Sequence, residues 1–402
     1  IRFQGFEDDW EQRKLGEMAD IVGGGTPSTK NDKYWNGDID WYSPAEINNQ
    51  IYVSGSQNQI TDLGLQKSSA RILPVGTVLF TSRAGIGKTV ILAKEGTTNQ
   101  GFQSILPHEN DLDSYFIFSR TNELKHYGET NGAGSTFVEV SGKQMAKMPI
   151  LLPKIEEQQK IGQLFKQLDK TIALHQRQLE LLKEQKKGFL QKMFPKAGET
   201  VPEIRFSGFV DEWEKRKLDD MTENHNSGVY IPKDQYGKGI NIIGVGDIYG
   251  SDVIDGRQYR LAPVKDERFI LHSGDLLYGE SSLVPEGIAR VVSVNQYGAG
   301  TAFAWHTRRF RVNNKLNSQF LGLELDYWFP ARSYLMRSAT KTALTGITTR
   351  DFFNTYIVFP GQSEQEHIVG LISSLDSIIN LKQRKVDILR ELKRGFLQQM
   401  FV

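Results

Sequence analysis

The sequence predicts a mixed α+β protein made of two repeats, in which two globular α/β domains are separated by two long antiparallel coiled-coil helices. Residues 150–194 return at 357–401 without a gap, and 21 of these 45 positions are identical. Residues 1–18 return at 204–221 with 12 identical positions of 18. Between these markers the two middle segments align poorly. A conserved frame around diverged middles predicts a pseudo-two-fold molecule with two different target surfaces.

The repeat markers divide the chain into seven segments. The segments are a first lead (1–18), a first middle domain (19–153), a first long helix (154–194), a linker (195–203), a second lead (204–221), a second middle domain (222–360) and a second long helix (361–402). Both middles are rich in turn residues and short β-branched runs, which indicates mixed α/β folding. We expect shorter helices at 114–128 and 317–329.

Each long helix carries an apolar seam at the three- and four-residue spacing of a coiled coil. The seam positions are Ile161, Phe165, Leu168, Ile172, His175, Leu179, Leu182, Lys186, Phe189 and Met193 in the first copy, and Ile368, Ile372, Leu375, Ile379, Lys382, Val386, Leu389, Lys393, Phe396 and Met400 in the second. Helices of this length span roughly 60 Å. Two-fold pseudosymmetry makes them antiparallel, places the middles at opposite ends of a rod and brings the chain termini together.

Two polar features of the helices have structural interpretations. His175 and Lys382 occupy the same seam position, where we expect a residue that fixes helix register rather than a ligand site. Ser363 and Glu366 match a capping box, which predicts Ser363 as the N-cap of the second helix.

Composition excludes several classes of function. The chain has 402 residues and no cysteine, so disulfides, thiolate catalysis and cysteine-bound zinc are excluded. No apolar run reaches the roughly 18 residues that a membrane span requires, so we expect a cytoplasmic protein. The net charge is +1, and the first middle domain holds 11 basic against 13 acidic residues. The second middle, counted over 224–356, has 15 against 12. We therefore expect the isolated chain to bind nucleic acid weakly.

One stretch resembles part of a phosphate-binding loop. Residues 84–89 read AGIGKT, but the full pattern requires glycine five places before Gly87, and Ser82 stands there. We expect a turn between strands, with Arg83 and Lys88 able to meet phosphate. A nucleotide-binding enzyme that uses the Ala84–Thr89 loop is kept as an alternative, as is a two-domain coiled-coil adaptor for other proteins.

Four features together resemble the specificity subunit of type I restriction–modification enzymes. They are the IRFxGFxDxWExRKL leads, the segment GGGTPSTKNDKYWNGDIDWYSPAEI at 23–47, TTNQGF at 97–102, and the helices with PxxxEQ and RxxGFLQxMF. The similarity covers essentially the whole chain. It implies that each middle is a target recognition domain reading one half of a bipartite DNA site, and that the helices set the length of the unread spacer.

The resemblance also implies the partners. The subunit is non-catalytic and holds no cofactor of its own. Its leads and helices dock two methylation subunits, which use S-adenosylmethionine to methylate adenine, and two restriction subunits add ATP- and Mg-dependent translocation and cleavage. Double-stranded DNA is the target, and no membrane is involved.

Direct base reading requires Arg, Asn and Gln side chains with Ser and Thr support, and the loops of both middles supply such residues. The loops that follow Phe80 and Tyr278 carry most weight, because the strands before them, LPVGTVLF and LHSGDLLY, are the clearest echo between the middles. The predicted DNA-binding residues are Thr26, Ser28, Lys30, Thr81, Ser82, Arg83, Lys88, Asn99, Gln100, Gln103, Ser135 and Thr136 in the first domain, and Tyr278, Glu280, Ser281, Ser282, Arg290, Thr301, Lys341, Thr342 and Thr345 in the second.

Overall fold

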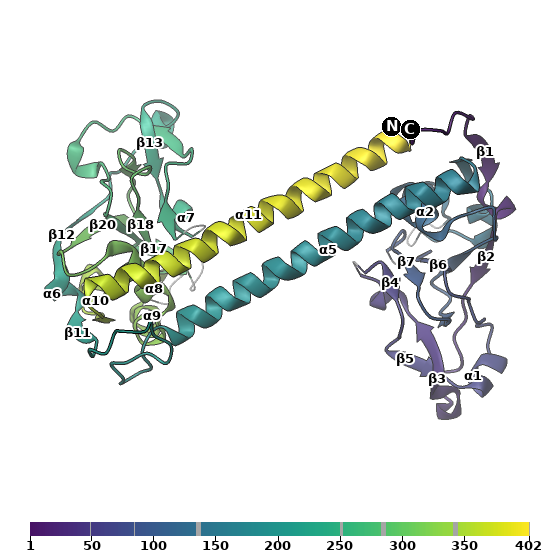
Figure 1. The fold of residues 1–402 in the computed structure, drawn as a ribbon, viewed down its shortest axis with the longest axis horizontal. Helices are drawn as coiled ribbons and strands as arrows, with labels where there is room; N and C mark the ends of the chain where they lie inside the picture. Colours follow the sequence, from purple (N-terminus) through teal and green to yellow (C-terminus); the bar gives the residue numbers. More distant parts are fainter. Residues whose placement is uncertain are drawn as a thin grey trace. The chain divides into compact units, whose positions relative to one another are not determined.

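The computed structural model divides the chain into two compact units. Unit 1 comprises Ile1–Gln176 and Arg384–Val402, and unit 2 comprises Arg177–Gln383. The structure describes residues 1–48, 50–83, 85–133, 138–249, 252–282, 287–340 and 345–401. The long helices α5 (Ile155–Lys192) and α11 (Gln362–Met400) are each continuous (Figure 1). The boundary between the units cuts both helices, so each unit contains one middle domain and half of each helix.

Unit 1 contains a five-stranded sheet of order β2-β9-β6-β7-β4, a three-stranded sheet of order β5-β3-β8, and the ribbon β1-β10. Its strands are β1 (Glu11–Lys14), β2 (Ala19–Gly23), β3 (Trp35–Tyr42), β4 (Tyr52–Val53), β5 (Asn58–Ile60), β6 (Val78–Phe80), β7 (Thr89–Leu92), β8 (Thr97–Thr98), β9 (Gln103–Pro107) and β10 (Pro149–Leu152). Its short helices are α1 (Asp62–Gln66), α2 (Ser114–Ser119), α3 (Thr121–Asn131) and α4 (Gly142–Met145).

Unit 2 repeats this topology with the sheets β12-β20-β16-β18-β14, β15-β13-β19 and β11-β22, and adds β17-β21. Its strands are β11 (Glu214–Lys217), β12 (Thr222–Ser227), β13 (Ile240–Ile243), β14 (Val253–Ile254), β15 (Arg260–Ala262), β16 (Leu276–Gly279), β17 (Ser281–Ser282), β18 (Val291–Val294), β19 (Ala302–Phe303), β20 (Thr307–Val312), β21 (Thr345–Gly346) and β22 (Tyr356–Phe359). Its helices are α6 (Leu218–Met221), α7 (Val245–Ile248), α8 (Ser318–Tyr327), α9 (Phe329–Ser338) and α10 (Thr349–Phe353). The middles therefore share one fold although their sequences align poorly.

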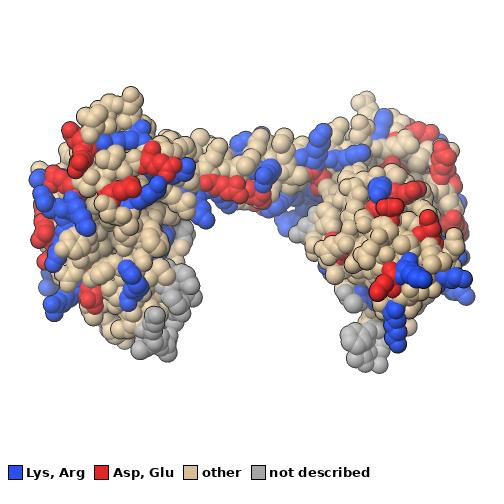
Figure 2. Space-filling view, turned by 90° about the horizontal axis from the view of Figure 1, so that it is seen from below, with Lys and Arg blue, Asp and Glu red and all other residues tan. Residues whose placement is uncertain are grey.

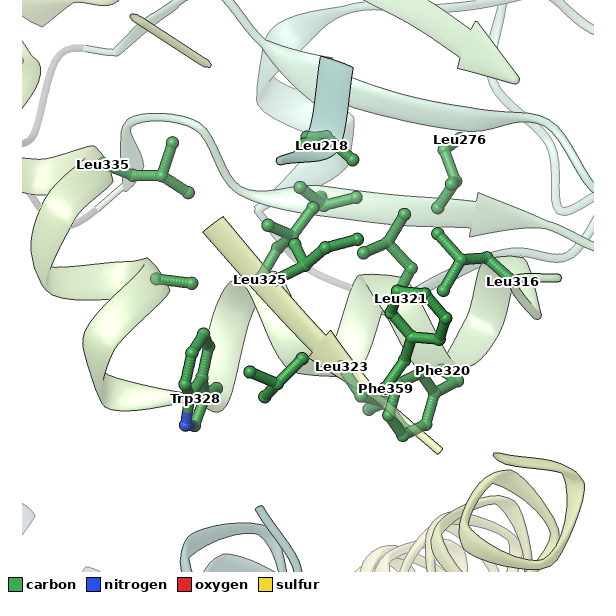
Figure 3. Close-up of a cluster of buried hydrophobic side chains, with 14 of the residues drawn as sticks. Leu218, Leu276, Leu316, Phe320, Leu321, Leu323, Leu325, Trp328, Leu335 and Phe359 are labelled. Carbon is green, nitrogen blue, oxygen red and sulfur yellow. The ribbon is translucent and has the colours of Figure 1, made fainter. Parts of the chain in front are cut away.

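The core of unit 2 forms where α8 packs against the large sheet and the strand that leads into α11. Phe320, Leu321 and Leu325 of α8 are fully buried in this cluster with Leu276 of β16 and Phe359 of β22 (Figure 3). Each such leucine or phenylalanine contributes about 1.5–3 kcal/mol when its side chain is removed from water. The core of unit 1 is built in the same way around α2.

Each of the two predicted shorter helices is broken within its predicted range. The predicted helix at 114–128 is interrupted at Arg120, whose φ of −93° and ψ of 22° leave the helical region, so α2 and α3 are separate. The predicted helix at 317–329 ends at Tyr327, and a new helix begins at Phe329 with proline near its start. Proline lacks the N–H group that a continuing helix requires.

The two long helices run antiparallel within each unit. In unit 1 the Lys393 ammonium lies 2.6 Å from Asp169. In unit 2 the Lys186 ammonium lies 2.8 Å from Asp376. Low numbers on α5 meet high numbers on α11, and both the lysines and the aspartates are equivalent in the repeat. Every predicted seam position is buried or half-buried, which confirms the heptad assignment.

The start of each long helix is fixed by the Glu-Gln pair of its PxxxEQ motif. In unit 2 Arg205 of the lead donates to both carboxylate oxygens of Glu364, at 2.7 and 2.8 Å. The Gln365 amide donates to the Pro360 carbonyl at 2.8 Å. The prediction of Ser363 as N-cap is wrong, because α11 begins at Gln362 and the carbonyl of Gly361 accepts the first helical hydrogen bonds.

The chain termini meet within unit 1, as the two-fold interpretation predicted. The Ile1 ammonium donates to the Gln399 carbonyl at 2.9 Å. The rings of Trp10 and Phe401 lie 6.1 Å apart between centroids. Figure 1 shows the two ends side by side.

Candidate nucleic-acid interface

In unit 1 two loops pack on each other where the two sheets meet. The loop after β2 approaches the loop between β8 and β9, and the Gly25 N–H donates to the Thr98 carbonyl at 2.8 Å. A Cβ on Gly24 would lie 2.0 Å from the Asn99 carbonyl oxygen. Only glycine permits this approach, because real Cβ atoms do not come so close to backbone.

Unit 2 builds the same junction from different residues. The Val229 N–H donates to the Phe303 carbonyl at 3.0 Å. A Cβ on Gly228 would lie 2.1 Å from the Ala304 carbonyl oxygen. The matching contacts make Gly228 the equivalent of Gly24, and Ala304 the equivalent of Asn99.

A third segment in each unit completes the junction. In unit 1 the Ser82 N–H donates to the Gly101 carbonyl at 2.8 Å, and in unit 2 the Glu280 N–H donates to the His306 carbonyl at 2.9 Å. Ser82 lies two residues after Phe80, and Glu280 lies two residues after Tyr278, the last residues of the two echoing sequence motifs. In unit 1 the loop after Phe80 therefore meets the loops that carry Thr26 and Gln100. In unit 2 the loop after Tyr278 meets the two equivalent loops.

The side chains at the loop tips differ between the units. In unit 1 the Thr26 hydroxyl donates to the Gln100 side-chain oxygen. In unit 2 the equivalent pair is Tyr230 and Trp305, whose rings meet edge to face at 5.4 Å and 75°. Tyr230 is 66% exposed and Trp305 is 51% exposed. One junction thus presents an amide, and the other presents aromatic rings.

Residues 85–88 of the AGIGKT stretch lie in the connection between the two strands of a β-hairpin. This connection joins β6 to β7, which pair antiparallel. The Lys88 ammonium donates to the Ile47 carbonyl at 2.9 Å, and the Lys88 N–H donates to the Thr81 hydroxyl at 2.9 Å. A phosphate-binding loop leads from a strand into a helix N-terminus, and here a strand follows. Ala84 lies outside the described residues, but the flanking strands do not provide the context of a nucleotide site.

Arg290, a predicted DNA contact, belongs to an internal ion-pair network. Its guanidinium lies 3.1 Å from Asp252 and 3.3 Å from Asp326. Burial raises the pKa of Asp326 to about 7, although the charge of Arg290 opposes this shift. Lys186 of α5 also reaches Asp252, at 3.2 Å. This network ties the second domain to its helices, so Arg290 has a structural role here.

The remaining predicted residues fall into groups by exposure. Tyr278 lies in the interior, because its ring is fully buried and stacks 3.6 Å from Phe352, and burial raises its pKa. The other predicted residues with buried side chains are Thr81, Ser82, Ser281, Ser282, Thr301 and Thr345. The exposed or half-exposed side chains are Thr26, Ser28, Lys30, Arg83, Lys88, Asn99, Gln100, Gln103 and Glu280. Ser135, Thr136, Lys341 and Thr342 lie outside the described residues.

Sequence reasoning missed the polar strand pair beside the second junction. Arg309 and Arg311 of β20 and Asn224 and Asn226 of β12 line a cleft of about 620 Å³. Arg309 donates to Asn224 at 3.1 Å, and burial lowers its pKa. Arg309 and Arg311 alternate in the sequence TRRFRV, directly after the turn that carries Trp305. This pattern could have indicated the polar strand pair.

On the face drawn in Figure 2, basic and acidic side chains are interspersed over each unit. Glu280 pairs with Arg308 at 2.7 Å, which partly neutralises the second junction. Among the residues that the structure describes, no cluster of His, Asp and Glu is placed to hold a metal ion. No helix in those same ranges is long and apolar enough to cross a membrane.

A chain with two domains of one fold, different loop tips and a shared helical pair has the architecture of a two-target recognition protein. The chain belongs to the type I restriction modification DNA specificity domain family, whose model matches residues 7–184 and 210–390. It is thus a specificity subunit of a type I restriction–modification system with two repeated recognition domains, and this family is non-catalytic.

The relatives agree over most of the chain. The type I restriction enzyme MjaIX specificity subunit of Methanocaldococcus jannaschii is 27% identical over 98% of this chain and 92% of its own length. The solved S subunit of a type I restriction–modification system from M. genitalium has a TM-score of 0.61 at 11% identity, covering 100% of this chain and 97% of that one. A chain from a structure of type I system assembly and conformational transition has a TM-score of 0.57 at 17% identity, with 99% of both chains covered. These two structures support the fold.

Proposed function

We propose that each recognition domain reads one half of a bipartite DNA site. The supporting observation is the pair of loop junctions, which have the same backbone contacts but carry Thr26 and Gln100 in one domain and Tyr230 and Trp305 in the other. A surface that binds one common partner twice would keep its side chains. Surfaces that read two different sequences need the same scaffold with different tips.

We further propose that the helices set the unread spacer between the half-sites. α5 has 38 residues and α11 has 39, and each continues from one unit into the other. At 1.5 Å per residue such a helix is roughly 57 Å long, which is less than two turns of B-DNA at about 34 Å per turn. Two reading domains joined by this pair can therefore address one duplex.

The partners complete the activity. We propose that two methylation subunits supply S-adenosylmethionine and methylate adenine in the cytoplasm, and that two restriction subunits supply the ATP- and Mg-dependent steps. Adenine methylation requires the base to leave the duplex stack, and grip on both flanks leaves the base between them free to turn out. The first domain, with 11 basic and 13 acidic residues, gives this chain little phosphate affinity of its own.

Methylome sequencing of a host that carries this chain with a methylation subunit tests the proposal. The expected result is one bipartite motif with a fixed spacer. Replacing residues 19–153 with the equivalent domain of another family member should change one half of the motif and leave the other. An active complex that methylates without a bipartite motif would contradict the proposal and favour the adaptor function.

The spacer role has a separate test. In unit 1 Arg390 donates to Gln176 at 3.0 Å, and in unit 2 Lys382 donates to Gln178 at 2.9 Å. Deleting residues 173–179 of α5 together with 383–389 of α11 therefore removes one heptad from each helix at this register and preserves the seam. This shortens the pair by about 10.5 Å, or about three base pairs at 3.4 Å each. The spacer should shorten, or activity should be lost, while both half-sites stay as they were. An active variant with the original spacer would rule out the ruler role.

A further inference from the structure

Gln100 and Trp305 occupy equivalent positions in the two domains, but their side chains differ in chemistry. The Asn99 N–H donates to the Tyr42 carbonyl at 3.0 Å, and the Ala304 N–H donates to the Ile243 carbonyl at 2.8 Å. These are equivalent contacts, because β8 and β19 pair in parallel with β3 and β13 at Tyr42 and Ile243. The next residue in each loop is Gln100 or Trp305.

We propose that this position determines sequence specificity in both domains, where Gln100 reads an adenine and Trp305 reads the methyl group of a thymine. The inference rests on the proposed function, because it assumes that each domain reads a half-site. It assigns one base contact to each half, at positions the fold makes equivalent.

Gln100 is arranged for bidentate reading. Its side chain is exposed, and the Thr26 hydroxyl donates to its oxygen and holds the amide in place. The carbonyl oxygen accepts two hydrogen bonds, so it can still accept from the adenine N6 amino group while the amide donates to N7. Fixing the amide before binding reduces the entropy lost in the complex.

Trp305 is arranged for apolar contact through its edge. One face of its indole stacks on the His306 imidazole, with centroids 4.3 Å apart and planes 18° apart. The edge-to-face contact with Tyr230 holds it from another side. A ring stacked on its own neighbour presents an edge, which suits a thymine methyl group better than insertion between bases.

The backbone at this tip is strained. His306 has φ 68°, in the left-handed region that is unfavourable for a residue with a side chain. Such a conformation persists where neighbouring groups stabilise it. Here the Glu280 N–H donates a hydrogen bond to the His306 carbonyl. The turn is therefore fixed in the geometry that exposes Trp305.

Protein docking is the competing explanation, because exposed Trp and Tyr are common in protein interfaces. The repeat argues against it. The frame that both repeats keep, including the leads and helices, suits partners that bind twice, whereas this position changes from an amide to an indole. A position that varies within a conserved scaffold suits a target that differs between the halves.

The test uses the complex of the full chain with its methylation subunit, and duplexes carrying the motif that methylome sequencing defines. Each base pair of both half-sites is varied in competition binding, and deoxyuridine replaces thymine one position at a time. Gln100→Ala should lose about tenfold discrimination at one adenine of one half-site. Trp305→Ala should lose a similar factor at one thymine of the other. Trp305→Phe should keep most of that preference.

The deoxyuridine duplexes give the sharpest comparison. The unmodified protein should lose affinity when one particular thymine loses its methyl group, and Trp305→Ala should lose nothing further from that change. Gln66→Ala in α1 and Tyr297→Ala are matched controls, because both side chains are exposed and neither residue belongs to the junction loops. Both should keep the original profile.

The outcomes separate this inference from the proposed function. A bipartite motif whose base preferences are unchanged in Gln100→Ala and Trp305→Ala would overturn the inference and leave the proposed function intact. A uniform loss of affinity over all sequences would do the same, since it indicates a phosphate or folding role. A parent complex without a bipartite motif would instead overturn the proposed function. If Trp305→Ala is not soluble, Trp305→Phe and the deoxyuridine series on the parent protein decide.

Discussion

The ion pair between Arg205 and Glu364, called the clamp here, should contribute more to the free energy of unfolding than the equivalent ion pair between Arg2 and Glu157. Both arginines donate to both oxygens of their carboxylate, at 2.7 and 2.8 Å for Arg205 and at 2.8 Å twice for Arg2. Both carboxylates are buried. The arginines differ, because the side chain of Arg205 is 12% exposed and that of Arg2 is 31% exposed.

Removing one arginine leaves a buried carboxylate without its partner. Breaking such a pair costs about 3–5 kcal/mol when both groups are buried. We therefore expect Arg205→Ala to lower the free energy of unfolding by roughly 3 kcal/mol. Water already reaches Arg2 and screens its pair, so Arg2→Ala should lower the free energy of unfolding by clearly less than Arg205→Ala. Removing Arg205 and Glu364 together should cost less than Arg205→Ala alone, because no unpaired charge then remains.

Denaturant unfolding of the single and double variants, followed by tryptophan fluorescence, measures these differences. Because a chain of two units need not unfold in one step, hydrogen exchange in residues 204–213 should be followed as well. Exchange there should accelerate in Arg205→Ala and stay unchanged in Arg2→Ala. A cost below about 0.5 kcal/mol for Arg205→Ala would refute the clamp, since that is the range of ordinary surface substitutions.

Three further predictions follow from the fold. A circular permutant opened within 195–203 and joined through the old termini should stay soluble and keep its DNA motif, because the Ile1 ammonium already contacts the Gln399 carbonyl; insoluble protein would count against this. Gly228→Ala should unfold at lower temperature and weaken binding at the second half-site, because its Cβ would lie 2.1 Å from a carbonyl oxygen, whereas Gly246→Ala, with open space around its Cβ, should not. Asp326 keeps its proton in the fold up to about pH 7, while the unfolded chain releases it near 3.8, so the unfolding free energy should fall as pH rises from 4 to 7; the slope should flatten in Asp326→Asn, and equal slopes would refute the assignment.

The helical frame could be predicted from sequence because its physical signal is local. A seam at heptad spacing is readable in one dimension, and burial of Ile161, Leu179 and Val386 follows from it directly. The duplication in the sequence further predicted that the two helices run antiparallel and that the chain termini meet. The cap at Ser363 was misplaced because Glu364 and Gln365 are committed to the lead and to Pro360, which shifts the first turn.

The equivalence of the recognition loops could not be predicted from the sequence, because only their backbone hydrogen bonds show which residues correspond. Nothing in TTNQGF and TAFAWH shows that Gln100 and Trp305 are equivalent until the carbonyls that their neighbours bond are known. The interior position of Tyr278 could not be predicted, because strand β16 is buried along its whole length and the residue before the loop points into the core. Strands covered on both faces give no alternation from which direction could be read.

The interleaving of the units has a consequence for the order in which the molecule matures on the ribosome. Unit 2 is one continuous stretch, Arg177–Gln383, and can pack as soon as that stretch has emerged. Unit 1 begins first but takes Arg384–Val402 from the far end, and Phe401 packs against Phe116 and Phe165 in its core. Contacts across almost 400 residues close last. The first domain to be synthesised is therefore completed after the second, and the apolar face of its part of α5 stays uncovered until the last turns of α11 have emerged.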